Sequence, residues 1–438
     1  MGHFVRSAFW IGVYFIVVMT PLLVMLVGPT PPGRGFWREL SVGLGFAGLS
    51  MMGLQFFLTG RFRSITFPYG IDVVYHFHRS ISLIAFLFIL LHPVMIFAAS
   101  PDALVLMIPA MMPRRTAAGL LGLLAFGIVI GTSLYRMKLG LRYEAWRALH
   151  GYASVAAVTL SVVHIVGVSY YVQGNLKRGV WIAVVIAWVL ALVYVRLIKQ
   201  AKMLKAPYRI ERVIKERGRS WTLVLSPEGH EGMRFRPGQF AWLTAGRSPF
   251  SIREHPFSFS SSAMDTRTIT MTVKELGDFT GKIGEIPPGT RAYIDGPYGT
   301  FTIDTRNAPS YVFIAGGVGI TPVMSILRTM ADRRDARPVV LIYGNKTWEE
   351  VTFREDLEEL KQRLAMRVVH VLDSPHEGWE GERGRVTAGL IARYLPENRM
   401  ECAYFICGPE PMQRGVRAAL DALGLPLEQV ESESFNFV

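Results

Sequence analysis

The chain has 438 residues, of which 50% are hydrophobic and only 18% are charged, and its mean hydropathy is +0.29. Soluble proteins average about 25% charged residues, so this composition argues against a purely cytosolic protein, and the 12% aromatic content excludes a disordered one. Two cysteines rule out a disulfide framework and any four-cysteine zinc or iron–sulfur site.

The net charge of +13 belongs to the first half of the chain. Residues 1–205 hold 18 Lys and Arg against 4 Asp and Glu, whereas residues 206–438 hold 29 against 30. The positive residues of the first half stand between long apolar runs, as membrane topology predicts, whereas a nucleic-acid-binding domain gathers its charge on a polar face. We therefore expect the protein to contact a lipid bilayer and no nucleic acid.

Apolar stretches of membrane-spanning length fill residues 1–205. A span needs about 20 apolar residues, and the stretches run roughly over 8–28, 40–59, 71–99, 116–135, 145–171 and 179–198. With a cytoplasmic N-terminus, the inner connections carry eleven Lys and Arg and the outer ones six. This bias predicts an integral membrane protein, in a bacterial inner (plasma) membrane, with both termini in the cytoplasm.

Four histidines recur at one spacing inside these stretches. Imidazole is costly within a bilayer, so each such histidine is a functional candidate. His78 and His92 lie 14 residues apart in the third stretch, and His150 and His164 lie 14 apart in the fifth. At 100° per residue, 14 steps fall about 40° short of four turns, so each pair shares one helix face and is about 21 Å apart along the axis.

The third and fifth stretches cross the membrane in the same direction, so these histidines would lie at two matched depths. His78 and His150 would share the cytoplasmic level, and His92 and His164 the outer one. Two imidazoles at each depth predict two bis-histidine haem sites, because two ligands leave the tetrahedral shell of zinc incomplete. The alternative is that these polar side chains hydrogen-bond across a helical bundle.

From about Pro207 the sequence changes to short strands separated by turns, which indicates an antiparallel barrel. The string HPFSFSS (255–261) puts aromatic rings beside hydroxyl groups on a strand, so a ring can cover a flavin while hydroxyls bind its N5 atom and phosphate. The glycine-rich turn at 277–281 offers backbone amides to a pyrophosphate. Each string taken alone is equally compatible with ordinary turn structure.

After Pro309 the pattern becomes an alternation of strands and helices. The apolar strand 311–315 runs into GGVGITP (316–322) and a helix, which predicts a phosphate-binding turn at a helix N-terminus. Lys346 follows the next strand and could accept the 2′-phosphate of NADPH, although a solvated loop lysine is the alternative. A later strand, 403–406, leads into CGPEPM at 407–412.

Together, the paired histidines and the strings HPFSFSS, GGVGITP and CGPEPM resemble the ferric reductase and NADPH oxidase superfamily over essentially the whole chain. The resemblance implies an α-helical membrane bundle of six spans with two haems at 1–205. A β-barrel FAD-binding domain would follow at 206–305, and an α/β domain that binds NAD(P)H would follow at 306–438.

The resemblance also implies the roles of individual residues. The haem iron ligands would be His78, His92, His150 and His164. The FAD site would comprise His255, Pro256, Phe257, Ser258 and Ser261, with Lys274, Gly277, Phe279 and Thr280 near the pyrophosphate. The nicotinamide dinucleotide would contact Gly316, Gly317, Gly319, Thr321, Pro322, Lys346, Cys407, Gly408 and Pro409. The catalytic residues would be Ser258, Cys407 and Phe435. Phe435 is preferred over Phe437 as the aromatic that stacks on the flavin. The alternative for Phe435 is an ordinary core aromatic of the last strand.

The resemblance implies that electrons pass from cytoplasmic NADPH, or NADH, through FAD and two b-type haems to an acceptor outside the cytoplasm. Oxygen, giving superoxide, is the preferred acceptor, because the outer loops hold no cluster of Asp, Met or His to collect metal. A ferric or cupric chelate is the alternative within this class. Two alternatives belong to other functional classes. The first is a haem-bearing subunit that passes electrons to a periplasmic partner protein, although no obligate partner subunit is indicated. The second is a non-redox transporter, and the intact motifs argue against it.

Overall fold

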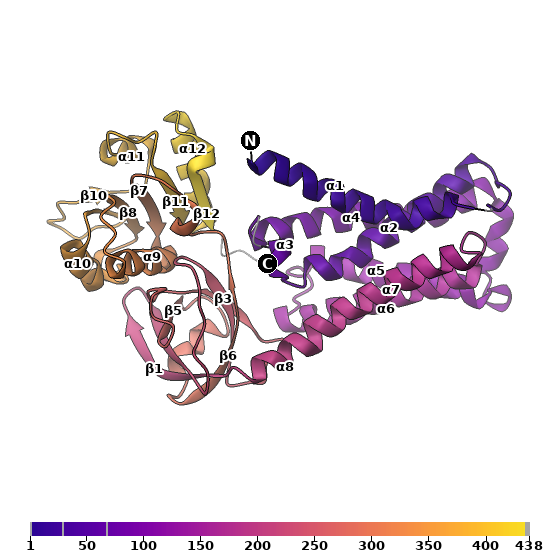
Figure 1. Cartoon of the computed structure of the whole chain (residues 1–438), viewed down its shortest axis with the longest axis horizontal. Coiled ribbons are helices and arrows are strands. Elements are labelled where there is room, and N and C mark those ends of the chain that lie inside the picture. The colour runs from indigo at the N-terminus through magenta and orange to yellow at the C-terminus, as the bar shows by residue number, and fades with distance from the viewer. Residues whose placement is uncertain (1, 29, 67–68, 434–438) are drawn as a thin grey trace. The chain divides into compact units, whose positions relative to one another are not determined.

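The computed structural model describes residues 2–28, 30–66 and 69–433. Its contacts divide the chain into two compact units (Figure 1). The first, helical unit comprises Met1–Phe62 and Val73–Ile198, and the second comprises Arg63–Asp72 and Lys199–Val438.

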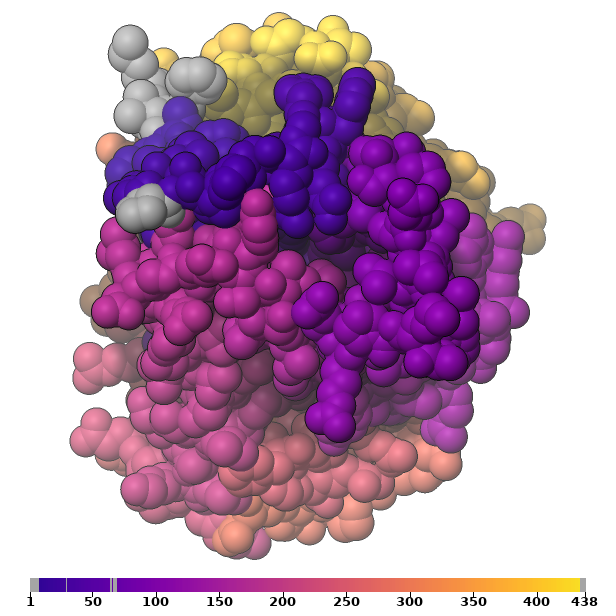
Figure 2. All heavy atoms as spheres, turned by 90° about the vertical axis from the view of Figure 1, so that its right-hand side faces the viewer, coloured from indigo at the N-terminus to yellow at the C-terminus, as the bar shows by residue number. Residues whose placement is uncertain are grey.

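The helical unit is built from long apolar helices. They are α1 (Gly2–Leu23), α2 (Phe36–Leu58), α4 (Ile71–Ala99), α5 (Arg114–Leu134), α6 (Tyr143–Val168) and α7 (Asn175–Val193). Within the described residues, six helices are long and apolar enough to cross a membrane, so the predicted number of spans is confirmed. Figure 2 faces the end of this unit at which the connections after α1, α4 and α6 lie, in indigo, purple and magenta.

Small residues let these helices approach one another closely, as is usual where packing inside lipid cannot rely on the hydrophobic effect. A methyl group added at Gly122 of α5 would lie 3.1 Å from the Ser161 hydroxyl of α6. A methyl group at Gly53 of α2 would lie 2.0 Å from the Trp188 ring of α7. Large apolar side chains such as Leu121 and Leu124 point outward and are exposed, as a surface that faces lipid requires.

The second unit begins with the short helix α3 (Arg63–Thr66) and resumes at α8 (Lys199–Leu204), which follows a π-helical turn at Tyr194–Ile198. Its first sheet is antiparallel, in the order β4-β3-β6-β1-β2-β5. These strands are β1 (Tyr208–Glu216), β2 (Ser220–Pro227), β3 (Phe240–Ala245), β4 (His255–Ser258), β5 (Ile269–Lys274) and β6 (Thr290–Tyr298). An isolated bridge between Phe259 and Met271 links the segment after β4 to β5. Closure into a barrel stays a prediction.

The second sheet is parallel, in the order β10-β9-β8-β7-β11-β12. Its strands are β7 (Tyr311–Gly316), β8 (Val339–Asn345), β9 (Met366–Leu372), β10 (Glu382–Arg383), β11 (Ala403–Cys407) and β12 (Val430–Glu433). The helices that accompany them are α9 (Ile320–Asp332), α10 (Arg354–Arg363), α11 (Ala388–Tyr394) and α12 (Glu410–Ala422).

Helices cover both faces of this parallel sheet. One buried apolar cluster joins the sheet to α9 and α10, and a second joins it to α11 and α12. Every residue of β7 is buried, as expected for a parallel strand covered on both faces. The predicted alternation of strands and helices is therefore confirmed, whereas the domain limits at residues 205/206 and 305/306 stay predictions.

Candidate functional site

Two pairs of histidines face one another between α4 and α6. The ring centroids of His78 and His150 are 6.3 Å apart, and those of His92 and His164 are also 6.3 Å apart. The structure therefore brings together the same partners that the repeated spacing of 14 residues indicated. Their role as metal ligands stays a prediction.

The Nδ1 atom of each of these four rings is hydrogen-bonded to a neighbouring helix or to the residues at its start. His78 Nδ1 lies 2.8 Å from Gln55 Oε1, and His92 Nδ1 lies 2.9 Å from the Ser41 carbonyl oxygen. His150 Nδ1 lies 3.1 Å from Ser133 Oγ, and His164 Nδ1 lies 2.8 Å from the Arg115 carbonyl oxygen. Such bonds fix the ring orientation and leave Nε2 as the nitrogen available to a metal.

The sequence analysis missed the polar partners of these rings, although two of them carried a signal. Ser41 and Gln55 are buried polar side chains inside the apolar helix α2. The other two acceptors come from Ser133 and Arg115 on α5. Helices α2 and α5 thus hold the imidazoles that α4 and α6 present.

Two glycines make room for the rings of the second pair. A methyl group at Gly45 of α2 would lie 3.2 Å from the His92 ring, and one at Gly119 of α5 would lie 2.7 Å from His164 Nδ1. Across the described ranges, no group of three or more His, Cys, Asp or Glu side chains is arranged to hold a metal ion.

In the second unit, β4 presents an aromatic stack. The rings of His255 and Phe279 are 4.1 Å apart and nearly parallel, at 9°, and Phe257 lies 6.3 Å from His255 at 24°. Next to them, Ser258 is 4% exposed, and its hydroxyl is buried with no hydrogen-bond partner among the residues described. A buried hydroxyl without a partner is costly, which indicates a ligand that completes the site.

Other residues of the predicted FAD site already have protein partners. Ser261 Oγ accepts a hydrogen bond of 3.0 Å from the Thr270 amide, and Lys274 Nζ lies 3.8 Å from Glu350 Oε2. The Gly277 amide donates to Thr280 Oγ1 at 2.8 Å, so a pyrophosphate would have to replace this bond or use other amides. Pro256 lies in the β3–β4 ladder, opposite Trp242.

The glycine turn after β7 touches the turn after β11. A methyl group at Gly319 would lie 2.2 Å from the Cys407 carbonyl oxygen, and one at Gly316 would lie 2.5 Å from Met412 Sδ. Gly317 has φ of +52°, a conformation that favours glycine. Both turns lie at the carboxyl ends of neighbouring parallel strands, where nucleotides bind in sheets of this kind.

The remaining predicted nucleotide residues lie around these turns. Thr321 Oγ1 donates to the Val318 carbonyl oxygen at 2.8 Å, and Pro322 lies in the first turn of α9. Gly408 follows β11, and Pro409 is the N-cap of α12. Lys346 is exposed on the loop after β8.

Cys407 is fully buried and opposes Glu433 in the β11–β12 register. Burial, with a smaller effect from Glu433, raises the pKa of the Cys407 thiol well above its usual range, so the thiol stays neutral. Phe435, and Phe437 with it, lie outside the described residues.

Comparison with known proteins shows two family matches. Residues 44–161 match a ferric reductase like transmembrane component, and residues 313–418 match an oxidoreductase NAD-binding domain. NADH-cytochrome b5 reductase 1 of Pyricularia oryzae is 34% identical over 169 residues, which are 37% of this chain and 55% of that protein. The glycine betaine monooxygenase reductase subunit of Chromohalobacter salexigens is 27% identical over 211 residues, 46% of this chain and 56% of that one.

Among solved structures, the FAD/NAD binding domain of nitric oxide dioxygenase from Vibrio cholerae has a TM-score of 0.46 at 20% identity, covering 52% of this chain and 97% of that one. The chain spans about half the length of the two curated relatives, 55% and 56%.

The class that the fold and these matches define is an integral membrane protein that combines a ferric reductase like transmembrane component with an oxidoreductase NAD-binding domain. More particularly, the ferric reductase-like membrane component followed by this module matches a single-chain protein of the ferric reductase and NADPH oxidase type. The recognition made from the sequence motifs is therefore confirmed.

Proposed function

We propose that this protein is a transmembrane NAD(P)H-dependent oxidoreductase that carries electrons from cytoplasmic NADPH through FAD and two b-type haems to an acceptor outside the cytoplasm. The acceptor that we prefer is oxygen, which would give superoxide. The observation that carries the proposal is the pair of facing imidazoles at each of two levels, His78 with His150 and His92 with His164.

The spacing of the rings fits haem iron. A metal ion bound by both rings of a pair would hold the ring centroids about 6 Å apart, because a metal–imidazole bond is about 2 Å long and each ring centroid lies about 1 Å beyond its nitrogen. The observed 6.3 Å in both pairs agrees with this estimate. Two histidines are enough for haem, because the porphyrin supplies the other four ligands.

The second unit offers residues that fit FAD and the nicotinamide dinucleotide. The unpartnered Ser258 hydroxyl would donate to the flavin beside the His255–Phe279 stack. Gly316 and Gly319 would let the dinucleotide approach the backbone at the start of α9. When bound, FAD would take electrons in pairs as hydride, and haem iron would carry them singly. Cys407 would border the nicotinamide as a neutral thiol.

We place these functions in a membrane domain at 1–205, a FAD-binding barrel at 206–305 and a NAD(P)H-binding domain at 306–438. The charge bias of the connections supports cytoplasmic termini in a bacterial inner membrane. Lys346 would contribute to a preference for NADPH over NADH.

Anaerobic titration of the purified chain with NADPH, followed optically, tests the proposal. The flavin band should bleach, the haem bands should sharpen, and admitting air should reoxidise both while a superoxide-specific probe responds. Reduction of a ferric chelate without superoxide would instead assign a metal reductase. A lack of either reaction in the isolated protein, with haems that still reduce, would indicate a partner protein as acceptor.

Two variants at the outer level test the ligands. His92→Leu and His164→Leu should each remove one haem and abolish reduction of the acceptor, while NADPH still reduces the flavin. If both variants retain two haems per chain, the ligand assignment is wrong.

A further inference from the structure

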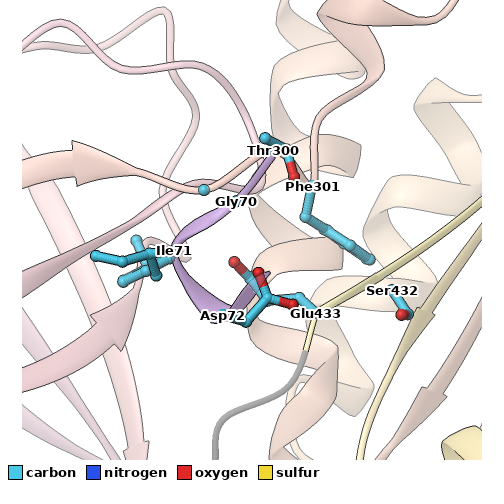
Figure 3. A pocket seen from close by; sticks show the side chains of 9 residues that line it. Gly70, Ile71, Asp72, Thr300, Phe301, Ser432 and Glu433 are labelled. Carbon is cyan, nitrogen blue, oxygen red and sulfur yellow. The ribbon is translucent and has the colours of Figure 1, made fainter. Parts of the chain in front are cut away.

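A small cavity lies inside the second unit, between residues 70–72 and the ends of β3 and β12. Its volume is about 10 Å³, room for one water molecule. Two acidic side chains line it, Asp72 at the start of α4 and Glu433 at the end of β12 (Figure 3). Phe240 and Thr300 form other parts of its wall.

The backbone of Glu433 is anchored by a hydrogen bond, whereas one oxygen of its carboxyl group has no hydrogen-bond partner among the described residues. The residue is 7% exposed, and Oε2 is buried without a hydrogen-bond partner in the described part of the chain. Its carbonyl oxygen accepts a bond of 2.9 Å from Gln413 Nε2. On another side stands Gly299, with φ of +100°, where a methyl group would lie 2.9 Å from Glu433 Oε1. The carboxyl group is therefore confined to the cavity.

Among the described residues, the charge that acts on Glu433 is the acidic Asp72. Cys407 faces it from β11 and Asp72 from α4. Arg417 of α12 donates to the hydroxyl of Ser432. Burial first, and then the charge of Asp72, raise the pKa of Glu433 well above its usual range.

We propose that Asp72 and Glu433 form a carboxyl pair that holds one proton in common across this cavity, and that Asp72 is a positioning residue that keeps Glu433 protonated beside Cys407. Two carboxyl groups that share a site titrate as a pair, and one proton stays bound to a high pH because both cannot ionise at low cost. A metal ion is a poorer occupant, because no set of three ligands exists among the described residues.

The pair makes the second unit sensitive to alkaline pH. While the proton is bound, a neutral carboxyl group faces the Cys407 thiol, and residues 70–72 stay against β12. When the proton is lost, two negative charges repel one another in a small cavity with little water to screen them. The contact should then open, and turnover with NADPH should fall. This activity readout rests on the proposed function, whereas the proton itself can be observed directly.

Infrared difference spectroscopy of the full chain in detergent gives the direct readout. The band of a protonated carboxylic acid should be present at pH 7, disappear at alkaline pH, and be absent from Glu433→Gln. The exposed Asp421 on α12 provides the matched control, since Asp421→Asn should leave the band unchanged. A spectrum at pH 7 that is identical in the wild type and Glu433→Gln would overturn the proposal.

The kinetic readout is the pH profile of kcat and KM for reduction of ferricyanide by NADPH. Glu433→Gln, which cannot ionise, should lose the alkaline fall in kcat. Asp72→Asn should lose the fall as well, because the second negative charge is gone and nothing repels an ionised Glu433. Asp72→Glu should restore it, and Asp421→Asn should match the wild type.

Asp72→Asn with an unchanged profile would overturn the role of Asp72, whatever the behaviour of Glu433→Gln. If no variant and no wild-type sample oxidises NADPH, the proposed function fails, and the infrared band still decides the carboxyl pair.

Discussion

Gly119→Ala should remove the haem that we propose at His92 and His164 without disturbing the rest of the chain. The new methyl group would lie 2.7 Å from His164 Nδ1, whereas ordinary contacts begin at 3.4 Å. The ring would therefore have to move by about 0.7 Å, and a metal ligand tolerates only about 0.2 Å. The same movement would strain the 2.8 Å bond from Nδ1 to the Arg115 carbonyl oxygen.

Gly127→Ala on the same helix is the matched control, because no heavy atom beyond the neighbouring backbone of that helix lies within 4 Å of the added methyl group. Both substitutions favour the helix by about 1 kcal/mol, so a loss seen only in Gly119→Ala cannot come from helix stability. The assay is haem per flavin, determined as the pyridine haemochrome. We expect about one haem in Gly119→Ala and two in Gly127→Ala, by the ligand count above. Equal haem content in the two variants would refute the reasoning.

Three further predictions concern the polar groups of the two units. Gln55→Leu leaves His78 Nδ1 without its hydrogen-bond acceptor, so the affinity for the proposed inner haem should fall by about 10- to 100-fold. The reduction potential of that haem should rise in a redox titration, and an unchanged potential would contradict the role of Gln55. Ser258→Ala should leave thermal stability unchanged, because the hydroxyl has no hydrogen-bond partner among the described residues. It should slow the reduction of the flavin by about 10- to 100-fold in stopped-flow measurements. Equal rates in the variant and the wild type would assign no role to the hydroxyl. Burial lowers the pKa of His370 to about 4, so the folded unit binds fewer protons than the unfolded chain between about pH 4 and 6.5. The free energy of unfolding should therefore fall by up to about 3 kcal/mol as the pH drops through that range. Thermal unfolding of His370→Asn should show a weaker dependence on pH there, and the same dependence as the wild type would contradict the assignment.

The histidine pairs could be predicted from the sequence because helix geometry converts a spacing of 14 residues into one face. Their anchors could not be predicted, because Gln55 and Ser133 lie on other helices whose rotation depends on packing. The same holds for Gly119, whose role is visible only once α5 lies against α6.

In the second unit, too, local features could be predicted from the sequence and tertiary contacts could not. Strand–turn–helix patterns located the glycine turn after β7, because local chain geometry governs it. The bond from the Gly277 amide to Thr280 was not anticipated, since a turn can satisfy its own amides. Nor was the meeting of Asp72 with Glu433, which are 361 positions apart in the sequence. Such pairings depend on tertiary packing that no local pattern records.

The most direct test of the account is the number and ligation of haems in the purified full chain. Haem and FAD would be quantified together after expression with added haem, and low-temperature electron paramagnetic resonance would report the iron ligands. The account predicts two b-type haems for each FAD, both low-spin with two imidazole ligands and both reducible by NADPH. A preparation that binds FAD but no haem, or haem with one imidazole only, would contradict it.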